Sequence, residues 1–154
     1  MNHSDQSDQS DQSRINAQPV LSGTLKVEQS VDGPFEATSI RYDFTRGDLW
    51  FQGEYVDGLG KIQLITLVLP YTEGTFSGGF SPNAEGYYTR RANDTSQSWH
   101  SVSGDYQATF IKRAGDLDGE FHFLGSWPGS ENRQFKGTFD IQTGPLSVKP
   151  NQLE

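Results

Sequence analysis

Six side chains between residues 87 and 127 have the types expected of a ligand-binding surface. They are Tyr87, Tyr88, Arg90, Trp99, His100 and Trp127. We expect both tryptophans in loops, Trp99 at the end of a polar loop over 92–98 and Trp127 within 126–132. A loop aromatic ring can stack on a sugar or another flat ligand, and Arg90 and His100 would then be its polar anchors. The alternative is that the rings close a barrel mouth or cap the core.

A second group of polar residues could line an interior. Glu120 and His122 are two positions apart, so in a strand they share one face, and Phe121 and Phe123 occupy the other. A His beside a carboxylate can act as a general acid or base near neutral pH. In a barrel with a lumen, these two residues and Glu54 would be candidate lumen residues. In a sheet whose Phe face is the core, Glu120 and His122 face solvent.

Residues 116–120, Asp-Leu-Asp-Gly-Glu, have the spacing of part of a calcium loop. The bidentate Glu expected about six positions after the Gly is missing, and strands rather than helices are expected on both sides. Turn chemistry accounts equally well for Asp and Gly here. The sequence also lacks a Gly-rich phosphate loop and a nucleophile elbow. We therefore predict no catalytic residue, metal ligand or cofactor from motifs, and favour a protein that is not an enzyme.

The composition restricts the class of partner. The formal net charge is −8, and the chain has no Cys, so it can form no disulfide. Nucleic acid is excluded as an expected partner because its binding relies on cations that neutralise phosphates. An anionic membrane surface is disfavoured for the same reason. A basic protein partner is compatible with this charge, and so is a small molecule or sugar.

Alternating apolar and polar residues predict about eight or nine short strands and almost no helix. The clearest examples are Ile40, Tyr42 and Phe44, the run 61–69 that is apolar on both faces, and the segment 135–141. Gly recurs in or beside nearly every strand, where it often marks a bend. This pattern predicts an all-β antiparallel barrel, with a β-sandwich as the alternative. Residues 137–139 weakly resemble 23–25, too briefly to count as a repeat, and a hypothesis from this likeness is that the first and last strands pair and close the sheet.

Both ends of the chain differ in composition from the middle. Residues 1–19 contain a Ser-Asp-Gln repeat with nothing apolar to bury, so we predict a disordered tail followed by one β domain over 20–144. Residues 145–154 form a C-terminal tail whose last two residues are typical of an expression-vector remnant. No signal peptide or transmembrane run is present, so we expect a soluble protein and predict no particular compartment.

The short aromatic-rich strands with Gly make the pattern similar to calycin-type and allene-oxide-cyclase-like barrels, by analogy of fold and without a shared motif. Three functions remain open. The first is a non-catalytic domain that binds a small molecule or carbohydrate at a barrel mouth. The second is a cofactor-free barrel enzyme of the cyclase or isomerase type, and the third is an acidic protein-interaction or inhibitor domain.

Overall fold

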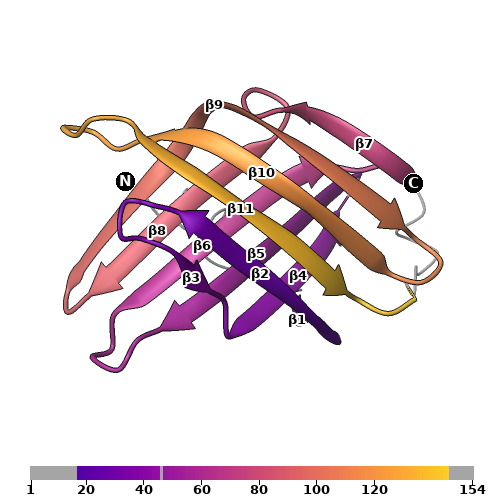
Figure 1. Ribbon diagram of the computed structural model, residues 1–154, viewed down its shortest axis with the longest axis horizontal. Coiled ribbons are helices and arrows are strands. Elements are labelled where there is room, and N and C mark those ends of the chain that lie inside the picture. The colour runs from indigo at the N-terminus through magenta and orange to yellow at the C-terminus, as the bar shows by residue number, and fades with distance from the viewer. Residues whose placement is uncertain (1–16, 46, 146–154) are drawn as a thin grey trace.

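The computed structural model describes residues 17–45 and 47–145, which form one antiparallel sheet of eleven strands (Figure 1). The prediction of an all-β barrel-like fold is confirmed. The strands are β1 (Gln18–Pro19), β2 (Ser22–Gln29), β3 (Phe35–Glu36), β4 (Ser39–Thr45), β5 (Asp48–Val56), β6 (Ile62–Pro70), β7 (Gly74–Gly79), β8 (Glu85–Ala92), β9 (Thr95–Ile111), β10 (Asp116–Ser126) and β11 (Arg133–Gln142).

The sheet curls into an open barrel rather than a sandwich. Its strand order is β1-β4-β5-β6-β8-β9-β10-β11-β2-β3, and β7 pairs with β9 beside β8. In Figure 1, β2, β10 and β11 lie in front of β4, β5 and β6 and cross them. Among the described strands, no ladder joins the two ends of the sheet. Instead, the segment after β3 bridges them, because the Ala37 amide donates to Leu25 of β2 and the Thr38 amide donates to Glu54 of β5.

The first long strand pairs with the last one, as hypothesised, but this pairing does not close the sheet. Phe139 of β11 lies opposite Leu25 of β2, and Ile141 lies opposite Gly23. This ladder curls the sheet, because it returns the C-terminal strand to the start of the domain. The aromatic core inside the curl is the physical reason that the two halves face each other.

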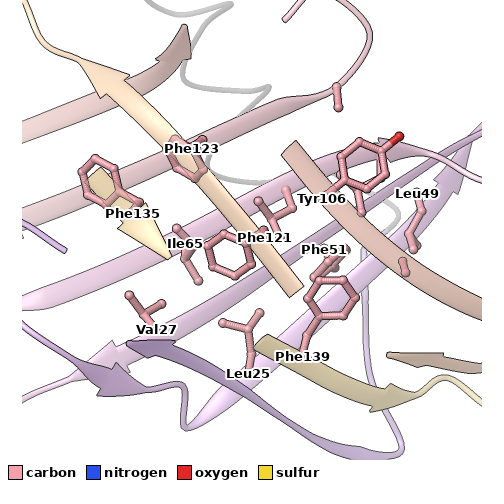
Figure 2. Packing of buried hydrophobic residues seen from close by; sticks show 14 of the residues in the cluster. Leu25, Val27, Leu49, Phe51, Ile65, Tyr106, Phe121, Phe123, Phe135 and Phe139 are labelled. Atoms are coloured by element: carbon pink, nitrogen blue, oxygen red, sulfur yellow. The ribbon is translucent and has the colours of Figure 1, made fainter. Parts of the chain in front are cut away.

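The interior is filled by aromatic and aliphatic side chains (Figure 2). The rings of Phe51 and Phe139 meet across the barrel with centroids 4.9 Å apart, and Phe121 lies 6.5 Å from Phe139. These three rings come from β5, β10 and β11, and each is 2% exposed or less. The space where a lumen was considered is therefore occupied by rings of the core.

Two local predictions differ from the structure. The predicted loop over 92–98 is a tight turn, and β9 begins at Thr95 and continues for 17 residues. Polar residues fill this part of β9 because one of its faces is turned outward, so a strand was mistaken for a loop. Gln18 and Pro19, predicted within the tail, form β1, which pairs with Arg41 and Tyr42 of β4.

The rest of the predicted N-terminal tail, 1–16, and most of the C-terminal tail, 146–154, lie outside the described residues. Within the described part of the chain, no helix has the length and apolar character needed to cross a membrane.

Candidate functional site

The six predicted ligand-binding residues do not come together as one site. Side chains alternate between the two faces of a strand, so neighbours on β8 and β9 separate. Tyr88 and Trp99 point into the core, and their sequence neighbours Tyr87 and His100 face outward. The prediction that Trp99 is a loop residue is wrong, because it lies within β9 and is only 2% exposed.

The outward pair, Tyr87 and His100, lies on neighbouring strands at directly opposite positions. Their rings meet edge to face with centroids 4.7 Å apart. The Tyr87 hydroxyl donates a hydrogen bond to the Glu85 carboxylate on the same face of β8. His100 is exposed, and Tyr87 is buried. The two residues thus form a packed cross-strand pair.

The inward group closes one end of the barrel. The Trp99 ring lies 5.7 Å from Tyr88 and 5.9 Å from Trp127, which is half-buried in the turn after β10. The guanidinium of Arg90 lies over the Trp99 ring at 5.2 Å, within the range of a cation–π contact. The Trp99 indole N–H is buried and has no hydrogen-bond partner among the described residues. The two tryptophans therefore pack on each other and cap the core.

A carboxylate that is not among the six predicted ligand-binding residues holds this end together. Asp32, between β2 and β3, accepts hydrogen bonds at 2.6 Å from both the Tyr88 hydroxyl and the Arg90 guanidinium. Lys61 lies 3.4 Å from the same carboxylate. The Tyr88 hydroxyl also lies 2.8 Å from the Gln63 side-chain oxygen. We call Asp32, Lys61, Gln63, Tyr88 and Arg90 the Asp32 cluster.

The environment of the Asp32 cluster shifts two pKa values. Burial alone would raise the pKa of Asp32, but the Tyr88 hydrogen bond and the charges of Arg90 and Lys61 outweigh it and lower the pKa. Burial, together with the hydrogen bond to Asp32, raises the pKa of the Tyr88 hydroxyl. Asp32 therefore stays ionised and Tyr88 stays neutral at pH 7. The one carboxylate of the cluster is held by two cations and a hydroxyl, which fits a structural role.

The candidate lumen residues lie outside the barrel. Glu120 and His122 are exposed on β10, and Phe121 and Phe123, which alternate with them, are buried in the core. The lumen placement considered for this pair is therefore wrong, because the Phe face of the strand forms the core. The His122 ring contacts the Gln134 side chain. Glu54 is half-buried on the outward side of β5, where Ser39 donates to it at 3.4 Å.

Glu120 and His122 belong to a larger acidic surface that the sequence alone did not reveal. We define the acidic face as the outward side chains of β9, β10, β11 and β2. Its exposed charged groups are six carboxylates and two lysines, namely Asp105, Asp116, Asp118, Glu120, Asp140, Glu28, Lys26 and Lys136. The alternation Asp116, Asp118, Glu120 is visible in the sequence, but the strand register is needed to place Asp140 beside it.

A groove of about 450 Å³ crosses the centre of the acidic face. Asp118, Glu120 and Asp140 line it together with Gln107, Lys26 and threonines on three strands. Asp118 and Asp140 lie directly opposite each other on β10 and β11. Among the described residues, the carboxylates of Asp118 and Glu120 form no hydrogen bond or ion pair, and the Asp140 carboxylate accepts only from the Gln142 amide at 2.9 Å.

The predicted calcium-loop fragment forms part of this same surface. Residues 116–120 begin strand β10 and do not form a loop. Alternation turns Asp116, Asp118 and Glu120 outward in a row along the strand. Within the described part of the chain, no group of three or more His, Asp or Glu side chains is arranged to hold a metal ion.

A second groove, of about 630 Å³, lies where the β9–β10 turn meets the segment before β7. Glu73, Lys112 and Arg113 line it, with Ile111 and Pro145. The Glu73 carboxylate accepts a hydrogen bond from the Lys112 amide at 3.0 Å. Because its charges are mixed, this groove selects neither an anionic nor a cationic ligand by charge.

The chain was compared with models of protein families, with curated proteins and with solved structures. None of them matches it significantly.

Proposed function

We propose that this protein is a non-catalytic interaction domain that binds a basic protein partner through the acidic face. The observation that carries the proposal is the groove in which Asp118 and Glu120 remain without any compensating partner among the described residues. A surface with an excess of negative charge attracts a positively charged partner over several ångströms and speeds association. This is the third of the functions that the sequence left open.

The arrangement of charges in the groove is costly for the folded domain. Like charges directly opposite each other on neighbouring strands destabilise a sheet, and Asp118 and Asp140 are such a pair. Positions where a chain departs from the most stable choice are often functional. A cationic side chain of a partner, placed between these two carboxylates, would relieve their repulsion on binding.

The other two functions require residues in positions that these residues do not occupy. A barrel enzyme needs Glu120 and His122 inside the barrel, where the core rings of Phe121 and Phe123 lie instead. A sugar site at the mouth needs accessible aromatic faces, but Trp99 is buried against Trp127. In the groove itself, the outward side chains are three carboxylates, one amide, three threonines and one lysine, so no aromatic ring among them is available for stacking.

The test is affinity capture from an extract of cells that express the protein, with two variants of equal charge. The first, Asp118→Asn/Asp140→Asn, removes two charges from the groove. The second, Asp94→Asn/Glu131→Gln, removes two exposed charges from turns outside the acidic face. We expect a basic protein that the wild type and the second variant retain and the first variant loses, with weaker retention at higher salt. Equal retention by both variants, or only acidic proteins captured, would overturn the proposal.

A further inference from the structure

Strand β7 leaves one of its edges unpaired. It forms a ladder with β9 over its whole length, Gly74 opposite Phe110 through Gly79 opposite Asp105, and with no other described strand. The neighbouring strand β8 pairs with the other half of β9 and with β6. The upper right of Figure 1 shows β7 at the rim of the barrel.

The register shows which backbone groups point away from β9. The Phe80 amide donates to the Gly104 carbonyl at 3.0 Å, and these two residues continue the β7–β9 register. In an antiparallel ladder, hydrogen-bonded positions alternate along the strand. Thr75, Ser77 and Gly79 therefore direct their N–H and C=O groups to the open edge. No backbone hydrogen bond joins these three to another described residue.

This edge lacks the protection that most exposed edges carry. Natural sheets block their edges with charged side chains, proline or bulges, because an open edge pairs with other chains. Gly74–Gly79 reads Gly-Thr-Phe-Ser-Gly-Gly, with no charge and no proline. A strand of this composition is open to an incoming extended segment.

The two glycines at the end of β7 differ in whether the barrel leaves room for a side chain. A Cβ on Gly78 would lie 2.7 Å from the Tyr106 hydroxyl oxygen, so the core excludes a side chain there. A Cβ on Gly79 would meet only the Gly104 carbonyl, at an ordinary 3.4 Å, and its φ lies outside the left-handed region. The barrel itself therefore does not need glycine at 79. Glycine in a strand often marks a place where another backbone approaches closely.

We propose that the open edge of β7 receives an extended segment of the basic partner as an added strand. The inference rests on the proposed function and specifies how the partner is held. Addition of a strand to a sheet edge is a common mode of peptide recognition, in which the backbone supplies affinity and alternate side chains supply specificity. Thr75, Ser77 and Gly79 supply the backbone groups here.

The chemistry of the added strand follows from the two faces of β7. On the outer face, Gly79 has no side chain and lies between the added strand and exposed Asp105 of β9. The added strand would be two strand spacings, or about 10 Å, from β9. A Lys or Arg can extend over Gly79 to this carboxylate, which has no ion pair among the described residues. On the inner face, half-buried Phe76 and bare Gly78 accept an apolar side chain. The segment should therefore alternate basic and apolar residues.

The experiment uses the full chain and a ten-residue peptide that alternates Lys and Val. Binding is measured by calorimetry, and amide hydrogen exchange is followed by NMR. We expect binding to slow exchange at Ser77 and Gly79. Methylation of alternate peptide amides should weaken binding at least tenfold, because it removes the donors to β7. The variant Ser77→Pro removes an outward N–H that the barrel does not use and should have the same effect, and Asp105→Asn should weaken binding severalfold.

The outcomes separate this inference from the proposed function. Binding that survives amide methylation but is lost in Asp118→Asn/Asp140→Asn would overturn strand addition and leave the acidic face as the binding surface. If amide methylation abolishes peptide binding and the Asp118→Asn/Asp140→Asn variant does not change it, the result would support the β7 edge as the binding site. It would count against the acidic face as the binding surface. No binding of the peptide at millimolar concentration would overturn strand addition. Because methylation alters only the peptide, this result does not depend on the folding of Ser77→Pro.

Discussion

The Asp32 cluster gives the sharpest prediction about stability. The variant Asp32→Asn keeps the shape of the side chain and removes its charge, so the 2.6 Å contacts with Tyr88 and Arg90 lose their ionic component. Hydrogen bonds to a charged group contribute about 1.5–3 kcal/mol each. Water compensates part of this loss, because the Arg90 side chain is 29% exposed, and the amide keeps one acceptor oxygen. We expect the free energy of unfolding at pH 7 to fall by about 2 kcal/mol.

The assay is urea unfolding followed by tryptophan fluorescence. With a urea dependence of about 2 kcal/mol per molar, the midpoint should fall by about 1 M. Asp94→Asn is the matched control, because Asp94 is exposed in the β8–β9 turn and no hydrogen bond of its side chain occurs among the described residues. A loss below about 0.5 kcal/mol in Asp32→Asn, or an equal loss in the control, would refute the reasoning.

The pH dependence tests the sign of the pKa shift. The folded pKa of Asp32 is lowered below its ordinary value of 3.8, so the ionised carboxylate stabilises the fold fully above that value. This stabilisation is lost as the pH falls through the folded pKa. The gap between wild type and Asp32→Asn should therefore stay constant from pH 7 to pH 5 and narrow only below pH 3.8. A gap that already narrows between pH 7 and pH 5 would mean that burial dominates and raises the pKa.

Two further predictions concern the sheet. Asp118→Asn should raise the free energy of unfolding by about 0.2–1 kcal/mol at low salt, because it removes the repulsion from Asp140; a loss of stability in urea unfolding would contradict the cross-strand pairing. Gly86→Ala should lower the melting temperature, at a cost of about 1–3 kcal/mol, because its Cβ would lie 2.6 Å from the Phe123 ring. Gly58→Ala, with nothing within 4 Å, is the control and should leave the melting temperature nearly unchanged.

The alternation of apolar and polar residues determined the fold class. A period of two sets one face of each strand toward a core, so Phe121 and Phe123 were placed together and Glu120 and His122 were placed on the other face from the sequence alone. The same alternation located most of the long strands. It failed at the start of β9, where several small polar residues in succession resemble a loop and only cross-strand pairing shows a strand.

The tertiary structure decided which face of each strand forms the core. It also decided which residues from distant strands are neighbours. The sequence left Glu120 and His122 either in a lumen or in solvent, and the packing of the Phe121 ring against Phe139 on β11 places them outside. Asp140 becomes a neighbour of Asp118 only through the register of β10 and β11. Local pattern specifies the period of a strand, but its partners and register depend on contacts between residues far apart in the chain.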